Sequence, residues 1–183
     1  MNRPEAIQLL EQQVSSDWLR KHSLASATIM EALARRLGGD PDAWWVAGLL
    51  HDLDFDQTQD PAEHGLRAAA LLRSRGLEDE LVDAVLAHNA EGLGLERRTT
   101  LDFALTCGES ITGLIVATAL VMPDKRLASV TGEAVVKRMK KKDFARKVSR
   151  ESILLCERAG LGLEEFAGLA VAAMQGVAAE LGL

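Results

Sequence analysis

Four histidines, His22, His51, His64 and His88, are the residues of this sequence best suited to chemistry. Each falls on a different predicted helix, and Asp52 directly follows His51. Neutral imidazole nitrogens together with a carboxylate oxygen form a donor set that suits Mn, Fe, Mg, Zn or Co. The pattern therefore indicates a site for one or two divalent metal ions, provided that the helices bring these side chains together.

Taken singly, each histidine has an ordinary structural explanation. His22 could be a surface residue of its helix, His64 a solvated residue in a first helical turn, and His88 a residue that ends a helix. A His-Asp pair alone is also a weak signal, because such dipeptides occur by chance. One alternative is therefore a helical scaffold without any metal site. The metal-site hypothesis requires all of these residues to meet around a shared cation.

The position of His51 and Asp52 favours the metal site. They follow an apolar run from Trp44 to Leu50, which predicts a buried helix that ends at this pair. Adjacent side chains diverge along a helix, but at its last turn both can converge on an ion that lies beyond the helix end. Asp54 and Asp56 follow, and we expect them to add negative potential at the same place.

The elements that must position these residues are all helical. Period-2 alternation and hairpin dipeptides are scarce, tyrosine is absent, and Asp-Pro and Gly signals mark helix starts and ends. The sequence therefore predicts an all-α bundle of about eight or nine helices. They span approximately residues 4–14, 17–37, 41–50, 60–76, 78–89, 100–121, 133–142, 149–159 and 163–181.

Length and composition predict one domain. The chain has 183 residues, of which 48% are hydrophobic, and this is enough for one substantial core. We expect a single domain over residues 1–183, with its core at about 18–122 and a C-terminal helical extension at about 123–183. Cys107 and Cys156 lie in apolar helical patterns, which predicts buried thiols in a reducing compartment and no disulfide.

Charge and hydropathy predict a cytoplasmic protein without membrane or nucleic-acid partners. The N-terminus lacks the pattern of a signal peptide, and the apolar stretch 111–122 is too short to cross a bilayer. The formal net charge of −6 argues against a stable nucleic-acid complex. The exception is the segment 125–150, which holds ten Lys or Arg against two acidic residues. It could face phosphate or simply form a solvated basic surface.

Order and spacing of these residues resemble the HD-domain superfamily of metal-dependent phosphohydrolases. The resemblance covers roughly residues 18–175 and rests on short segments. They are His22-Ser23-Leu24-Ala25, Gly48-Leu49-Leu50-His51-Asp52-Leu53-Asp54-Phe55, Glu63-His64-Gly65, Ala87-His88-Asn89 and Cys107-Gly108-Glu109-Ser110-Ile111-Thr112-Gly113-Leu114-Ile115. The resemblance implies an HD-domain-like bundle in which these histidines, with Asp52, bind metal.

One position departs from that family pattern. Where a subgroup of small HD proteins carries a metal-binding aspartate, this chain has Glu109, whose side chain is one methylene longer. A glutamate can still ligate, but the ligand distance would shift. Asp102, seven residues earlier and therefore on the same helix face, is the alternative late carboxylate.

The resemblance implies hydrolysis of a phosphate ester in a nucleotide or similar small metabolite, with Asp52 and His51 as catalytic residues. The first ion would be held by His22, His51, Asp52 and Glu109. The second would be held by His64 and His88, with Asp52 bridging the two. Lys or Arg from residues 125–150 could neutralise the substrate phosphate. Glu109 also motivates an alternative: a catalytically impaired HD protein that binds metal and a nucleotide or metabolite as a regulator.

Overall fold

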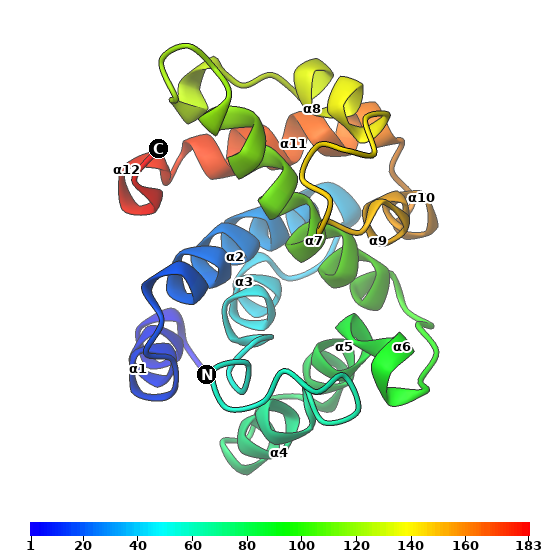
Figure 1. Cartoon of the computed structure of the whole chain (residues 1–183). Coiled ribbons are helices and arrows are strands. Elements are labelled where there is room, and N and C mark those ends of the chain that lie inside the picture. The colour runs from blue at the N-terminus through cyan, green and yellow to red at the C-terminus, as the bar shows by residue number, and fades with distance from the viewer.

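The computed structural model describes residues 1–183 and is helical throughout, without a strand (Figure 1). This confirms the predicted all-α class. The elements are α1 (Arg3–Gln13), α2 (Asp17–Leu37), α3 (Pro41–Leu50), α4 (Leu66–Ser74), α5 (Asp79–His88), α6 (Ala90–Leu93), α7 (Thr100–Leu120), the 3-10 turn η1 (Leu127–Ser129), α8 (Gly132–Met139), α9 (Arg150–Leu154), α10 (Cys156–Ala159), α11 (Leu163–Gln175) and α12 (Ala178–Leu181).

The structure has more helices than the eight or nine predicted, because two predicted helices are each divided and because the short helix α6 forms in a stretch without a predicted helix. The helix expected over 149–159 consists of α9 and α10, which meet at Leu155. The helix expected over 163–181 is interrupted after Gln175, where Gly176 follows, a residue type that weakens a helix interior. The basic helix expected to reach residue 142 ends at Met139.

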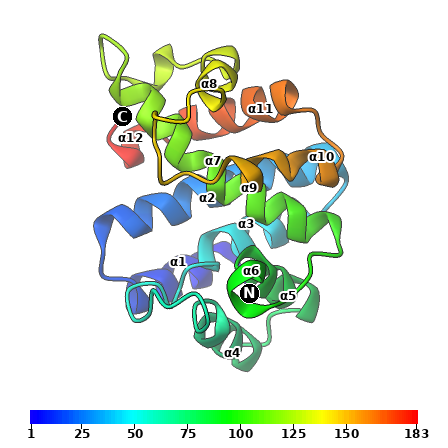
Figure 2. The same cartoon turned by 45° about the vertical axis from the view of Figure 1, so that its right-hand side comes forward.

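Helices α2 and α7 form the centre of the molecule. They cross near its middle, with α4, α5 and α6 on one side and α8 and α11 on the other (Figures 1 and 2). A helix over 17–37 was expected from its cap signals, and it ends at Gly38, whose φ of +82° is the left-handed conformation typical of a helix C-terminus. Helix α7 begins with a capping box between Thr99 and Asp102.

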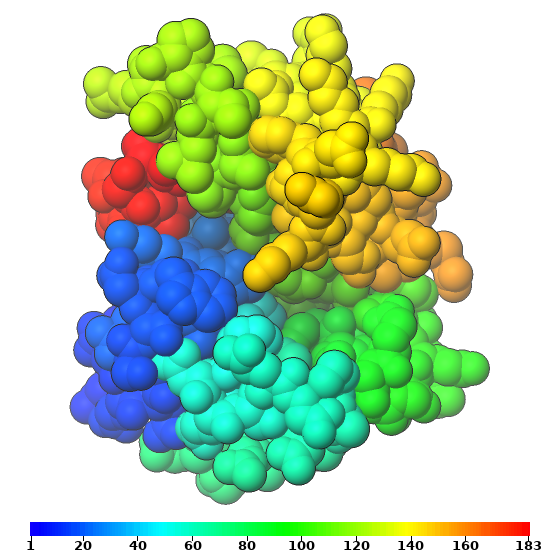
Figure 3. Space-filling view, viewed as in Figure 1, coloured from blue at the N-terminus to red at the C-terminus, as the bar shows by residue number.

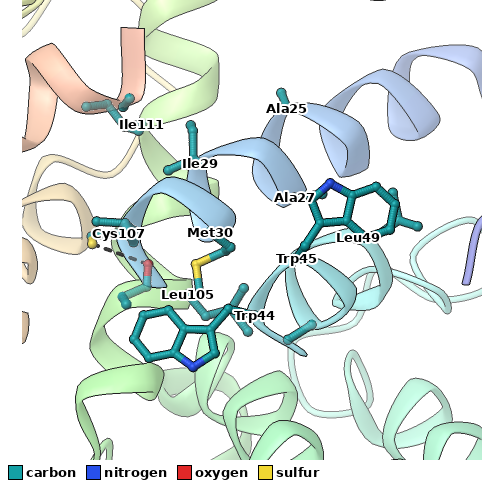
Figure 4. Close-up of a cluster of buried hydrophobic side chains, with 14 of the residues drawn as sticks. Ala25, Ala27, Ile29, Met30, Trp44, Trp45, Leu49, Leu105, Cys107 and Ile111 are labelled. Atoms are coloured by element: carbon teal, nitrogen blue, oxygen red, sulfur yellow. Dashed lines mark hydrogen bonds between the residues drawn. The ribbon is translucent and has the colours of Figure 1, made fainter. Parts of the chain in front are cut away.

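Helix α3 packs closely on α2 because Gly48 has no side chain. A Cβ atom built at Gly48 would lie 2.8 Å from Met30 Cγ and 2.9 Å from Ala27 Cα. Trp44, Trp45 and Leu49 extend this buried contact (Figure 4). The close approach holds the C-terminal end of α3, and with it His51, against α2.

The C-terminal helices share the hydrophobic core with the rest of the chain. One cluster of 49 buried residues runs from Ala6 to Leu181 and includes Phe166 and Met174 of α11. Both cysteines, Cys107 and Cys156, are buried free thiols, as predicted.

Helix α7 is the most apolar long element. By length and composition its 21 residues could cross a membrane, but 67% of its most apolar stretch is buried inside the fold. The helix predicted over 100–121 is confirmed, and its buried apolar residues begin at Leu101, well before the apolar stretch 111–122. Its burial is that of a core helix.

Candidate metal centre

The candidate ligands come from five separate places in the fold. His22 lies in α2, His51 caps the C-terminal end of α3 and is followed by Asp52, His88 is the last residue of α5, and Glu109 lies in the middle of α7. This agrees with the predicted placement on separate elements.

His64 is placed differently from the prediction. It was expected in the first turn of a helix that starts near residue 60, but it lies in the turn before α4. Helix α4 starts only at Leu66 because Gly65, with φ of +94°, interrupts the helical backbone. The buried carboxylate of Asp54 accepts the backbone N–H groups of Gly65, Arg67 and Ala68, which fixes this late start.

The carboxylate of Asp52 lies between two pairs of imidazoles. Its Oδ2 is 3.5 Å from His22 Nε2 and 3.4 Å from His51 Nε2. Its Oδ1 is 3.1 Å from His64 Nε2 and 3.4 Å from His88 Nε2. Each set of three groups has its ligand atoms within 4.8 Å of one another. The two sets, each of which could hold a metal ion, share Asp52.

The opposite ring nitrogen of each histidine is held by a fixed partner. The Nδ1 atoms of His51 and His88 face the backbone carbonyls of Gly48 (2.8 Å) and Val85, which can only accept hydrogen bonds. These two rings therefore carry a proton on Nδ1 and turn an Nε2 lone pair toward Asp52. Orientation of this kind is usual for metal-ligating histidines.

In the other two histidines, the Nδ1 atom faces a side chain that can accept its proton in a hydrogen bond. His64 Nδ1 is 2.9 Å from the Asp54 carboxylate, and His22 Nδ1 is 3.0 Å from Thr112 Oγ1. The Thr112 hydroxyl donates its own proton to the carbonyl of Glu109, so it accepts from His22.

With all four imidazoles neutral, the centre therefore contains acceptors without donors. His22 Nε2 lies 3.2 Å from His51 Nε2, and His64 Nε2 lies 2.9 Å from His88 Nε2. Two facing lone pairs at such a distance repel each other, and the Asp52 carboxylate adds negative charge between them. A cation, either a proton or a metal ion, relieves both repulsions.

Of the two late carboxylates, the structure brings Glu109 and not Asp102 to the centre. Glu109 Oε2 is 3.9 Å from His22 Nε2, at the edge of the first group, and its other oxygen is bonded by Ser110. The Asp102 carboxylate accepts the backbone N–H groups of Arg98 and Thr99 at the start of α7. The alternative assignment to Asp102 is wrong because that side chain caps its own helix.

Comparison with known proteins agrees with this geometry. The HD domain matches residues 19–121, which is more than half of the chain. This chain belongs to the HD-domain family. The matched range contains every candidate ligand named above.

One curated relative differs in its described activity. It is a tRNA (cytidine(56)-2'-O)-methyltransferase from Thermoplasma volcanium, 30% identical over 125 residues, which are 66% of this chain and 37% of the relative. The HD-domain chain thus spans little more than a third of that protein's length. No solved structure matches the chain.

Electrostatics in the HD-domain centre depend on burial and on Asp52. Burial, together with the charge of His51, lowers the pKa of His22 to about 4. Burial also opposes a charge on His64, but hydrogen bonds with Asp52 and Asp54 outweigh it and raise the pKa of His64 to about 9. A proton therefore resides on His64 at neutral pH when no metal is bound.

The carboxyl groups of Asp52 and Glu109 also have pKa values shifted in opposite directions. Burial opposes ionisation of Asp52, yet the charge of His51 and hydrogen bonds from three histidines hold the pKa of Asp52 well below its ordinary value. Burial raises the pKa of Glu109 to about 7, because the charge of His51 and the hydrogen bond from Ser110 offset only part of the cost of burying its ionised form. A metal ion near His22 would favour the ionised form of Glu109.

Of the two acidic residues that follow the His-Asp pair, only Asp54 belongs to the centre. Asp54 is 1% exposed and orients His64, a role that the sequence did not reveal. The carboxylate of Asp56 accepts hydrogen bonds from Ser15 and Ser16 ahead of α2, so it stabilises the fold and not the site.

A groove of about 310 Å³ opens beside His22 and Glu109. Its lining also includes Lys147, from the basic segment, and Ser149. Figure 3 shows the recess where the blue, cyan, green and yellow parts of the surface meet. A larger hollow of about 490 Å³, between α5 and the start of α7, contains none of the histidines.

Proposed function

We propose that this HD-domain protein is a metal-dependent phosphohydrolase that acts on a phosphate ester of a nucleotide or similar small metabolite. The observation that carries the proposal is the pair of acceptor-only groups that share Asp52. Such a centre requires cations, and two cations joined by one carboxylate are a common arrangement for hydrolysis of phosphate esters.

The residues fit one or two metal ions. His22, His51 and Asp52 would hold the first, with Glu109 as a further ligand at its edge, and Asp52, His64 and His88 would hold the second. Four imidazoles favour first-row ions such as Mn, Fe, Co or Zn over Mg, which prefers oxygen ligands. A divalent cation in such a site acidifies water and stabilises negative charge on phosphoryl oxygens.

The reaction needs little from other side chains. The oxygen of water forms a bond to phosphorus, the bond from phosphorus to the ester oxygen breaks, and the alcohol leaves with a proton that water supplied. Asp52 and His51, fixed at the end of α3, keep the centre in position on one side. The groove beside His22 and Glu109 provides space for the ester.

The test combines metal analysis with turnover. Purified protein should contain stoichiometric transition metal, and His51→Ala and Asp52→Ala should each lose metal and phosphatase activity on a panel of nucleoside mono-, di- and triphosphates. Asp56→Asn is the matched control, because Asp56 contacts Ser15 and Ser16 only. Full activity in His51→Ala and Asp52→Ala would refute the proposal.

A regulator on the same fold is the second candidate, and the position of Glu109 favours it. Glu109 lies outside both three-residue groups, at 3.9 Å from His22. Replacement by aspartate separates the two functions. An impaired protein should gain turnover in Glu109→Asp, whereas an enzyme adapted to glutamate should keep or lose it. Tight ligand binding without turnover in any variant would favour the regulator.

Methyl transfer is not proposed for this chain. The chain covers 37% of the methyltransferase that it resembles, and imidazoles around a carboxylate are metal ligands. We expect a small phosphorylated substrate and no stable nucleic-acid complex. The buried free thiols of Cys107 and Cys156 support a reducing compartment such as the cytoplasm.

A further inference from the structure

The segment between α8 and α9, residues 140–149, is folded around the side chain of Arg150. The Arg150 guanidinium donates to the backbone carbonyls of Ala145 and Val148, and also to those of Lys141 and Phe144. Ala145 adopts a positive φ of 46°, which residues other than glycine seldom do, and this turns the chain back toward α7. The segment is thus a defined structure built around one partly buried cation.

A close contact with α7 places this segment beside the metal centre. A Cβ atom at Gly113 would lie 3.1 Å from Val148 Cγ2, so the segment approaches α7 where the helix has no side chain. Gly113 is one helical turn beyond Glu109 and directly follows Thr112, the partner of His22. The segment therefore forms one wall of the groove beside the candidate ligands.

Lys147 is the charged residue that this wall contributes to the groove. It lines the groove together with His22 and Glu109, is exposed, and forms no ion pair in the structure. A solvent-accessible ammonium group without a carboxylate partner, next to a centre for cations, is suited to bind an anion that also contacts those cations.

An acidic hollow continues the groove on its far side. It measures about 280 Å³, shares Ser149 and Ser152 with the first groove, and includes Glu91 and Glu151. Glu91 is paired with Arg97, whereas Glu151 forms no ion pair. The unpaired carboxylate of Glu151 is suited to accept hydrogen bonds from hydroxyl or amino groups, and it would repel additional phosphates.

We propose that Lys147 binds the phosphate of the substrate, and that the substrate is a monophosphate ester whose alcohol part carries hydroxyl or amino groups. This inference rests on the proposed function, since it assigns a ligand to the same centre. The proposal assigns phosphate binding to one of the ten Lys and Arg residues in the segment 125–150. It also excludes nucleoside triphosphates as the preferred substrates.

Binding of inorganic phosphate to the Mn-loaded protein, measured by calorimetry, tests the role of Lys147 without relying on turnover. Lys147→Ala should weaken phosphate binding about tenfold or more, as expected for loss of one charge-assisted contact. Metal content should stay unchanged. Lys142→Ala is the matched control, because Lys142 is exposed on the same segment but does not line the groove. In turnover assays Lys147→Ala should raise KM for a monophosphate, with Lys147→Arg restoring part of it.

The outcomes separate this inference from the proposed function. Phosphate binding that depends on Lys147, in a protein without any turnover, supports the inference while the hydrolase proposal fails. Equal phosphate affinity in Lys147→Ala and the unaltered chain, or no phosphate binding by the unaltered chain, overturns the role of Lys147. Triphosphates hydrolysed as efficiently as monophosphates would overturn the assignment of substrate class.

Discussion

Replacement of Asp54 by asparagine tests whether the second cation position depends on which nitrogen of His64 carries the proton. The Asp54 carboxylate accepts His64 Nδ1–H at 2.9 Å through Oδ1. Its Oδ2 accepts the backbone N–H groups of Gly65, Arg67 and Ala68. In Asp54→Asn, the amide oxygen keeps the three backbone bonds by taking the place of Oδ2, which turns the NH₂ group toward His64.

An NH₂ group next to Nδ1 reverses the tautomer of His64. Nδ1 must then accept, so the proton moves to Nε2, which donates to Asp52 Oδ1 at 3.1 Å and has no lone pair left for a metal. Loss of such an outer partner costs about 10- to 100-fold in metal affinity. Neutral bonds replace bonds to a charged acceptor, so we also expect a loss of about 2 to 3 kcal/mol in the free energy of unfolding.

Calorimetric titration of Mn²⁺ into metal-free protein measures this effect, and urea unfolding measures stability. The unaltered chain should show two binding events, of which Asp54→Asn weakens one and leaves the position at His22 and His51 close to its original affinity. Asp56→Asn provides the control: it should reduce stability without affecting either event, because its partners are Ser15 and Ser16. Two unchanged binding events in Asp54→Asn would refute the tautomer argument.

Two further predictions concern pH and packing. Without metal, stability should fall as pH rises from 6.5 toward 9, because the raised pKa of His64, about 9, keeps a proton bound in the folded state that the unfolded chain releases. Below pH 6.5 the lowered pKa of His22, about 4, and the raised pKa of Glu109, about 7, have opposite effects on stability, so the change there should be small. Saturating Mn²⁺ should abolish the alkaline loss, and unfolding curves of both forms across pH 4–9 check this. Gly48→Ala should lower the free energy of unfolding in urea by about 1 to 3 kcal/mol, because the new Cβ atom would lie 2.9 Å from Ala27 Cα. Gly168→Ala should stabilise α11 by up to about 1 kcal/mol, because no atom lies within 4 Å of its Cβ position. A destabilised Gly168→Ala or a neutral Gly48→Ala would contradict this packing.

The helices and the four histidines were predictable because their signals are local. Asp40 before Pro41 and the apolar run up to Leu50 predicted α3, and the structure has that helix with Asp40 as its cap. The breaks near Leu155 and after Gln175 were missed, since the apolar periodicity continues across both. Periodicity reports which residues are buried, and it does not report where a helix changes direction.

Residues that orient the ligands were harder to find from the sequence. Asp54 was recognised only as a negative charge, and its partners in the turn after His64 are ten to fourteen residues away. The assignment of Asp102 as an alternative ligand could have been avoided, because Thr99 three residues earlier forms the pattern of a helix cap. Local sequence thus contained the evidence against Asp102 but not the evidence for Asp54.

The choice between hydrolase and regulator depends on Glu109 because each histidine ligand is held by a partner outside the centre that fixes its position. His51 and His88 bond backbone carbonyls, and His64 bonds a carboxylate that is itself held by backbone N–H groups. Glu109 bonds only the neighbouring Ser110 and lies 3.9 Å from His22. Its side chain is therefore free to approach or leave a metal ion without a change in the backbone. A shorter aspartate would change that reach, so the response of turnover to Glu109→Asp reports directly whether contact with this carboxylate is part of the reaction.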